Sequence, residues 1–301
     1  MRIKKHNWAF HAMLSPGMIL LFIFNVIPMI GIIIAFQRYS PFAPRWGLAS
    51  PWVGLQNFRT LLFVHPDAMQ VVRNTIIIAS WRIVLMLTVP VAFAILLNEC
   101  LNIGAKRVIQ TIVYLPHFLS WVIVGAMFMQ FFSPTGIVNT MLLSLGILQE
   151  PISFMRSNTW FRPIVIGTDV WKNFGFASIV YIAAITNIDP NLFEAAEIDG
   201  ANRWQRISRI TIPCVKPTIV LMGTLALGGI LSVSGDQILN MYSIPVYRTG
   251  DVVSTFVYRI GILNMRFHLA TAMELMTSVI GMVLIIISWF LARKFAGYSI
   301  F

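Results

Sequence analysis

The sequence predicts an all-α integral membrane protein with six transmembrane helices, both termini on the cytoplasmic side, and a polar helical hairpin between the fourth and fifth spans. Composition is the first observation behind this prediction: of 301 residues, 57% are hydrophobic and only 11% are charged. A soluble protein carries about 25% charged residues. The mean hydropathy is +0.78. Such a chain has too few charges to cover a water-facing surface, so its class is that of membrane proteins.

Six apolar segments are the second observation. A helix that crosses the hydrocarbon core needs about 20 mostly apolar residues. The predicted spans, whose ends are approximate, are 13–36, 74–97, 110–132, 161–186, 217–234 and 268–291. The first is too long for the core of a signal peptide and is predicted to be an uncleaved helix, and Asn74 is a candidate N-cap for the second. No repeat or linker divides the chain, so residues 1–301 form one transmembrane domain.

The distribution of basic residues orients these spans. Cytoplasmic loops of membrane proteins are enriched in lysine and arginine. With the N-terminus inside, every lysine outside a span lies on the cytoplasmic side. The net charge of +11 does not indicate nucleic-acid binding, because the basic residues are scattered and no compact basic domain holds them. The two cysteines, Cys100 and Cys214, have neither disulfide-framework nor metal-site spacing, and are interpreted as reduced and structural.

The loop 189–213 is the most polar part of the chain, and its residues predict two short helices. Asp189 followed by Pro190 is an N-cap with proline at the first helical position. Gly200 ends that helix. Asn202 can cap a second helix, with Gln205 at the capping-box position. The second helix is expected to end at Pro213, just before the fifth span. Composition alone favours an amphipathic loop resting on lipid headgroups.

The spacing within this loop favours a more specific interpretation. "EAAEIDGANRWQRISRITIP" (194–213) resembles the EAA loop of the permease subunits of ABC importers, whose pattern is E-A-A, three residues, G, nine residues, then I-x-L-P. The matching residues here are Glu194, Ala195, Ala196, Gly200, Ile210 and Pro213. Isoleucine stands in place of the leucine, a change that keeps an apolar side chain of similar volume.

The resemblance implies that this loop is a coupling helix seated in a groove of a separate ATPase. Ala195 and Ala196 would allow close approach, Glu194 would offer a charged contact, and Gly200 would allow the bend. The chain has no G-x-x-x-x-G-K-[ST] phosphate loop, so it is not expected to be an enzyme. It is expected to hold no cofactor and no metal, and ATP and Mg are expected on the partner ATPase.

Weaker resemblances over nearly the whole chain indicate the carbohydrate type of permease. They are "VGLQNF" (53–58), "LPHFLSWVIVG" (115–125), "SGDQILNMY" (234–242), "VVSTFVYRIGI" (252–262) and the tail "ARKFAGYSIF". The family implies a second, often different, permease subunit, two ATPase subunits, an extracytoplasmic solute-binding protein and a carbohydrate substrate. It also implies multi-pass insertion in the bacterial cytoplasmic membrane. A permease for another solute class remains the alternative.

Polar residues within or beside the spans are candidates for the substrate path. Asp169 and Lys172 lie three residues apart in the fourth span and can pair, either lining a pore or holding a helix interface together. Arg82, in the second span, can extend toward the interface, contact the partner permease or meet the ligand. His117 is interpreted as a satisfied buried histidine rather than a metal ligand.

A second polar group lies at the outer end of the fifth span. Its members are Asp236, Gln237, Asn240 and Tyr242, and Glu274 either joins them or caps the sixth span. Carboxylate and amide groups suit hydroxyl-rich ligands, and an aromatic ring can stack on a sugar. Ordinary loop polarity is the competing interpretation.

Two other function classes fit the sequence less well. An ion-coupled secondary transporter would need internal repeats and intramembrane carboxylates, but no repeat is visible and Asp169 is the only acid well inside a span. A membrane enzyme would need a catalytic cluster at a membrane face, and the sequence offers none.

Overall fold

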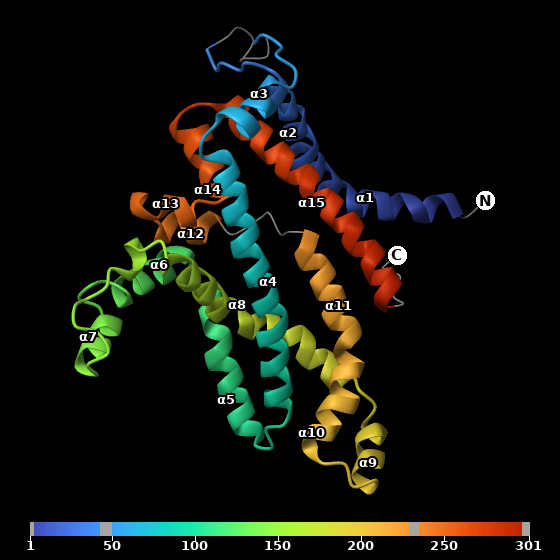
Figure 1. The fold of residues 1–301 in the computed structure, drawn as a ribbon. Helices are drawn as coiled ribbons and strands as arrows, with labels where there is room; N and C mark the ends of the chain where they lie inside the picture. Colours follow the sequence, from blue (N-terminus) through green and yellow to red (C-terminus); the bar gives the residue numbers. More distant parts are fainter. Residues whose placement is uncertain (1–2, 43–49, 229–234, 297–301) are drawn as a thin grey trace. The chain divides into compact units, whose positions relative to one another are not determined.

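The computed structural model describes residues 3–42, 50–228 and 235–296, and within these ranges the chain is helical without a β-strand. One isolated antiparallel bridge joins Gln37 and Trp52. The chain divides into two compact units, Met1–Met69 with Phe256–Thr277, and Gln70–Thr255 with Ser278–Phe301. Figure 1 shows the helices of each unit.

The first unit begins with a long apolar helical run. Its elements are α1 (Ile3–Leu21), η1 (Phe22–Val26), α2 (Ile27–Met29), η2 (Ile30–Phe36), α3 (Gln56–Arg59), η3 (Thr60–Val64), the end of α14 (Val253–Tyr258), η8 (Arg259–Leu263) and the start of α15 (Phe267–Ala296). Phe10–Phe36 is long and apolar enough to cross a membrane, which agrees with the predicted first span. The side chain of Asn57 closes the following loop, because its amide donates to the carbonyls of Ala35 and Gln37.

The second unit holds most of the remaining helices. They are α4 (Ala68–Asn98), α5 (Ile103–Tyr114), η4 (Leu115–Phe118), α6 (Trp121–Phe131), α7 (Ile137–Ser144), η5 (Phe154–Arg156), α8 (Phe161–Thr186), α9 (Pro190–Ile198), α10 (Arg203–Arg206), η6 (Ile207–Thr211), α11 (Ile212–Gly228), α12 (Gly235–Met241), η7 (Ile244–Val246) and α13 (Tyr247–Gly250). Two apolar clusters lie within it. One is built around Phe161, Val165 and Ile238, and the other around Ala94 and Tyr181.

The second span starts earlier than the sequence predicts. Helix α4 begins at Ala68, so Asn74 lies inside the helix and the N-cap prediction is wrong. The amide of Asn74 instead donates to the backbone carbonyls of Arg248 and Asp251. Asn74 is fully buried and ties the first turns of α4 to the α13 loop, because a buried amide needs such partners.

The third predicted span, 110–132, is broken in the middle. The helical segments Ile103–Phe118 and Trp121–Phe131 meet at an angle of 101°. Pro116 supplies no N–H for a continuing helix, Leu119 is extended, and the Ser120 hydroxyl accepts from the Ile123 N–H to start α6 anew. The predicted third span is therefore a bent pair of helices.

The other spans agree with the sequence to different degrees. Helix α8 has the predicted bounds, 161–186, and α15 covers the predicted 268–291. The fifth span is displaced, because the helix runs over Arg203–Leu227 and residues 229–234 lie outside the described part of the chain. By length and composition, four described helices can cross a membrane, or up to six if each of two bent pairs counts as one span.

Candidate functional site

The polar hairpin is built from α9, a glycine turn and α10. The Asp189 carboxylate accepts from the Asn191 N–H at 3.0 Å, with Pro190 in the first helical turn, as the sequence predicts. Glu194 and Ala195 are exposed and Ala196 is half-buried. The three residues of the E-A-A triplet therefore lie on a short helix that begins at a satisfied cap.

The turn after α9 depends on glycine. Gly200 has φ +77°, a left-handed conformation that costs other residues roughly 1–2 kcal/mol. Its N–H donates to the Glu197 carbonyl, and the Ala201 N–H donates to the Ala196 carbonyl at 2.8 Å. These bonds satisfy the last carbonyls of α9, and they confirm the predicted bend.

The second arm is fixed by two local contacts. Asn202 and Gln205 form the predicted capping box, with reciprocal bonds of 2.9 and 2.8 Å. Arg206 reaches back across the turn to Glu197, with 3.3 Å between Nη1 and Oε2. This pair is exposed and is worth at most about 1 kcal/mol by itself, but it closes a hairpin whose ends are already capped.

The hairpin does not end at Pro213 as predicted. Helix α10 continues through the π-helical turn η6 into α11, so Ile210 lies in the π turn and Pro213 inside one continuous helical run. Proline is tolerated there because it is at the second residue of α11, beside a turn whose hydrogen-bond ladder has already changed from i→i+4 to i→i+5. Movement of the hairpin is therefore linked to the fifth span by one helix.

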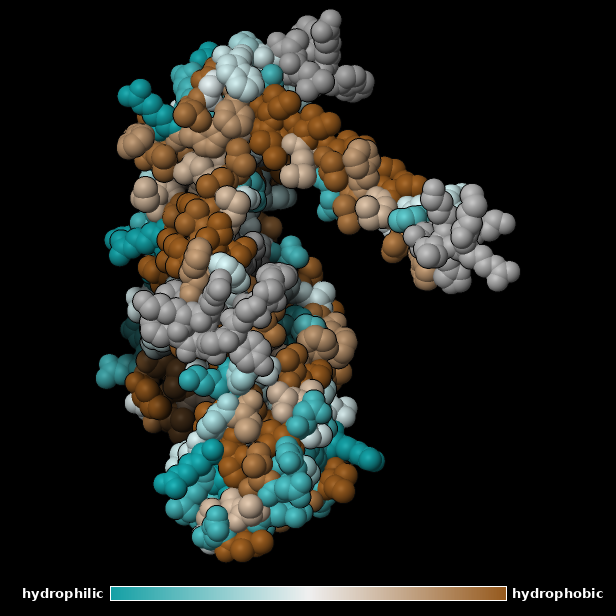
Figure 2. All heavy atoms as spheres, turned by 90° about the vertical axis from the view of Figure 1, so that its right-hand side faces the viewer, coloured by the Kyte–Doolittle hydropathy of each residue, from teal (hydrophilic) through white to brown (hydrophobic). Residues whose placement is uncertain are grey.

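Hydrophilic side chains gather over this end of the second unit, at the bottom of Figure 2. Three large apolar residues are nevertheless exposed on the hairpin: Leu192, Ile198 and Trp204. Ile198 and Trp204 are 87% and 72% exposed. Exposed apolar side chains within a polar rim are typical of protein interfaces.

A polar cluster lies along α8. Arg82 of α4 pairs with Asp169, with 2.6 Å between Nε and Oδ2, and the Asn173 amide donates to the other carboxylate oxygen at 3.0 Å. Lys172 instead donates to the His117 carbonyl and lies 5.3 Å from the centre of the Trp121 ring. The predicted pairing of Asp169 with Lys172 is therefore wrong, because the closer cation comes from another helix.

His117 joins the same cluster and is only half-buried. Its Nδ1 is 3.0 Å from the side-chain oxygen of Asn173, and its ring stacks on Phe176 at 4.1 Å between centroids. Sequence reasoning gave no role to Asn173 or Trp121. Only the break at Pro116, which carries His117 and Trp121 toward α8, brings them together with Lys172.

Three comparisons with known proteins bear on this arrangement. Residues 85–296 match the family model described as "Binding-protein-dependent transport system inner membrane component". That match covers more than two thirds of the chain, including the hairpin and all of the α8 cluster except Arg82. The chain belongs to this family. It is therefore an inner-membrane component of a bacterial transport system, of the permease type.

Relatives of this inner-membrane component resemble it over almost its whole length. Protein LplB of Bacillus subtilis is 36% identical over 300 residues, covering 99% of this chain and 92% of LplB. The polygalacturonan/rhamnogalacturonan transport system permease protein YteP of the same organism is 34% identical, covering 97% and 89%. The crystal structure of a bacterial ABC transporter involved in import of the acidic polysaccharide alginate contains a chain with a TM-score of 0.88 and 38% identity, with 97% of both chains covered.

The second polar group of this permease, which contains Asp236, Gln237, Asn240 and Tyr242, does not form a single ligand-facing surface. The Gln237 side chain is 1% exposed and donates to the Val165 carbonyl and the Thr168 hydroxyl of α8. Asp236 is exposed, and the Asn240 amide donates to its carbonyl. The Tyr242 ring stacks on another tyrosine. Gln237 thus contacts α8 rather than an open path, which does not support its predicted contact with sugar.

Glu274 is the last of the predicted substrate-path candidates. Glu274 is exposed on α15, seven residues after the helix begins, so it does not cap that helix. Among the residues that the structure describes, no group of three or more His, Cys, Asp or Glu side chains is placed to hold a metal ion.

Proposed function

We propose that this chain is one permease subunit of an ATP-driven importer that moves oligosaccharides or polysaccharide fragments into the cytoplasm by alternating access. The substrate class is supported by YteP, named for polygalacturonan and rhamnogalacturonan, and by the alginate importer. A second structure holds that importer with a periplasmic protein bound to alginate pentasaccharide. The hairpin 189–213 is the observation that carries the proposed link to ATP.

The hairpin suits a docking role for three physical reasons. Its shape is fixed before binding by the Gly200 turn and by the capping box, so little conformational entropy is lost on docking. Its exposed surface includes Glu194 and Trp204, and tryptophan is enriched among interface hot spots. It also continues directly into a span-length helix. A movement of the docked hairpin would therefore be transmitted into the membrane.

The energy source lies outside this chain in our proposal. The sequence has no phosphate loop, so ATP and Mg bind to a separate ATPase that receives the hairpin. The complete importer contains two such ATPases, a second and different permease subunit, and an extracytoplasmic solute-binding protein that delivers the sugar. Each partner follows from the family and from the docking surface described above.

Six spans with both termini in the cytoplasm complete the proposal. This count treats the bent pair α5–α6 as one span and takes α8 alone as the fourth span, with α9 beyond it in the hairpin on the cytoplasmic side. The topology is tested by cysteine labelling in a variant lacking Cys100 and Cys214. Phe42→Cys, at a residue 97% exposed, should react with an impermeant thiol reagent outside intact cells, and Gln205→Cys should not. Labelling of position 205 but not 42 would reverse the orientation.

The α8 cluster is the proposed sugar-contacting part of the path. Because Arg82 neutralises Asp169, the charge of Lys172 is held by a carbonyl and by the Trp121 ring, without a carboxylate within ion-pair distance among the described residues. Aromatic rings, an amide and an ammonium group together suit a hydroxyl-rich ligand. Such contacts are individually weak, about 0.5–1.5 kcal/mol each, which suits a path that must release its substrate.

Site-specific crosslinking tests the docking proposal. A photoreactive amino acid at Ala195 should crosslink to the co-expressed ATPase, whereas the same group at Leu145, an exposed residue directly after α7, should not. Equal crosslinking from both positions, or none from Ala195 in an active importer, would contradict it. Uptake that persists without ATP and follows a proton gradient would favour the alternative of an ion-coupled transporter.

A further inference from the structure

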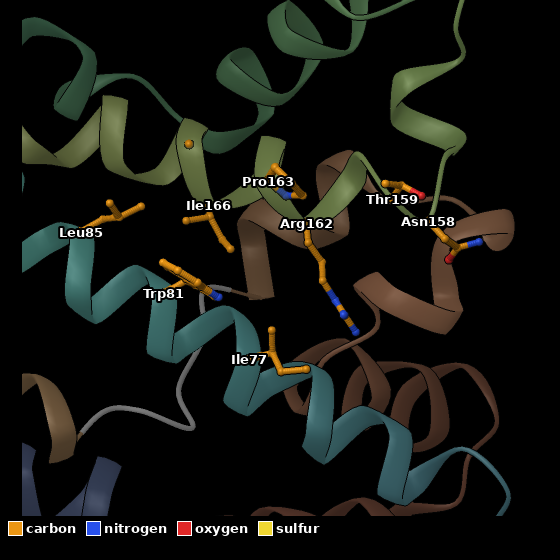
Figure 3. A pocket seen from close by; sticks show the side chains of 9 residues that line it. Ile77, Trp81, Leu85, Asn158, Thr159, Arg162, Pro163 and Ile166 are labelled. Carbon is orange, nitrogen blue, oxygen red and sulfur yellow. The ribbon is translucent and has the colours of Figure 1, made fainter.

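A cavity between α4 and α8 is distinct from the polar cluster described above. It has a volume of about 540 Å³ and lies wholly within the second unit. Its lining residues are Ile77, Trp81, Leu85, Asn158, Thr159, Arg162, Pro163, Ile166 and Gly167. Figure 3 shows Ile77 and Trp81 of α4 facing Arg162 and Ile166 of α8 across this space.

Polar and apolar lining residues are separated along the cavity. Asn158, Thr159 and Arg162 lie before or within the first turn of α8. Ile166, one turn further into α8, and Leu85, two turns beyond Ile77 in α4, make the deeper wall apolar. The cavity therefore has a polar end at the start of α8 and an apolar end that extends into the membrane-spanning part.

Arg162 supplies a positive charge at the polar end without a carboxylate partner. Its Nε donates to the Thr249 carbonyl and its Nη2 to the Asn74 side-chain oxygen. Among the described residues, no carboxylate accepts a hydrogen bond from Arg162, and no acceptor is bonded to its Nη1. Arg73 is close enough for its positive charge to act on Arg162. A half-buried guanidinium beside another cation favours a bound anion, since intramembrane charges are normally paired.

Thr159 adds a hydrogen-bond donor at the same end. It is exposed, and its hydroxyl bonds to no described residue. Guanidinium and hydroxyl donors together match the oxygens of a phosphate group. A sugar chain would instead need polar partners along the whole cavity, where the deeper wall offers Leu85 and Ile166.

We propose that this cavity binds an anionic phospholipid, with the phosphate at Arg162 and Thr159 and one acyl chain along the apolar wall formed by α4 and α8. The polar-to-apolar order of the lining matches a lipid whose headgroup lies at the start of α8. A guanidinium is suited to bind a phosphate headgroup because its N–H groups match the phosphate oxygens. The inference rests on the location of the chain in the membrane and not on its transported substrate.

Native mass spectrometry of the purified importer in detergent tests the proposal. Dioleoylphosphatidylglycerol and dioleoylphosphatidylcholine, which share acyl chains and differ in net charge, are the two probes. The parent should retain phosphatidylglycerol in preference. Arg162→Gln should weaken that retention about tenfold, the scale of losing a hydrogen bond to a charged group, and leave phosphatidylcholine unchanged. Arg156→Gln, which removes an exposed cation outside the cavity, is the matched control and should behave as the parent.

A second variant tests the acyl-chain wall without disturbing Arg162. A Cβ added at Gly167 meets nothing within 4 Å, so Gly167→Leu should fill the cavity, keep the fold and lower retention of both lipids. Equal retention of the two lipids by the parent, or full retention by Gly167→Leu, would overturn the proposal. Displacement of bound phosphatidylglycerol by trigalacturonate would also overturn it and would assign the cavity to the sugar path.

Discussion

Replacing Arg82 by glutamine should destabilise this permease more than replacing its partner, Asp169, by asparagine. The two side chains form one ion pair but differ in exposure, since Asp169 is 1% exposed and Arg82 is 29% exposed. Arg82→Gln leaves a buried carboxylate with one hydrogen bond, from Asn173. Asp169→Asn leaves a guanidinium on a long stem that can reach a more polar environment.

The magnitudes follow from this asymmetry. Removing one partner of a buried pair costs about 3–5 kcal/mol because the other charge stays buried. We expect a loss in this range for Arg82→Gln and a smaller one, about 1–2 kcal/mol, for Asp169→Asn. The double variant Arg82→Gln/Asp169→Asn buries no charge at this position. Its stability should therefore be close to that of Asp169→Asn alone, so the coupling energy between the two sites should be close to the Arg82→Gln loss, about 3–5 kcal/mol.

Thermal unfolding of the purified importer, at fixed detergent and lipid, measures this order. Arg107→Gln, which removes an exposed cation on α5 that makes no side-chain bond among the described residues, is the control and should melt as the parent does. Equal losses for the two single variants would refute the argument from burial. A double variant as unstable as the sum of the two single changes would show that the charges are not coupled.

Further predictions concern Gly200, Gln237 and His65. Gly200→Val should strain the left-handed turn by about 1–2 kcal/mol and reduce co-purification of the ATPase, whereas Ala201→Val should not; equal co-purification would count against the turn. Gln237→Ala should lower the melting temperature, on the scale of about 1–3 kcal/mol for unsatisfied buried groups, without changing which oligosaccharide is preferred in uptake assays. Burial lowers the pKa of His65, so its neutral form favours the fold; that stability is present above pH 6.5 and lost as the pH falls through the lowered pKa. His65→Gln should therefore reduce the difference in melting temperature between pH 7 and pH 5, and an unchanged difference would contradict this.

Local signals in the sequence predict the parts of the fold that depend on neighbouring residues. The bounds of α8, the cap at Asp189, the turn at Gly200 and the capping box at Asn202 all follow from residues within one or two turns. The side-chain oxygens of Asp189, Asn202 and Gln205 each accept from a backbone N–H within three residues. These features can therefore be predicted without knowledge of the tertiary structure.

The errors arise where distant residues meet. Asn74 is of a residue type that often caps helices, but its side-chain amide donates to backbone carbonyls more than 170 positions away in the chain. Asp169 and Lys172 have the spacing of a helical pair, yet Arg82 from α4 is the closer cation. Gln237 has an amide of the kind that binds sugar hydroxyls, but this amide donates hydrogen bonds that hold α12 against α8. No periodicity in a single sequence encodes these contacts.

The central claim, that ATP drives sugar uptake through the hairpin, is tested most directly by transport in proteoliposomes. The permease pair and its ATPase would be reconstituted without an ion gradient, with binding protein and labelled oligosaccharide on one side and ATP with Mg on the other. We expect uptake to require both ATP and binding protein. Uptake should fall in Gly200→Val, while sugar binding to the binding protein stays unchanged. Uptake without ATP, or full ATP-driven uptake in Gly200→Val with its turn demonstrably altered, would contradict it.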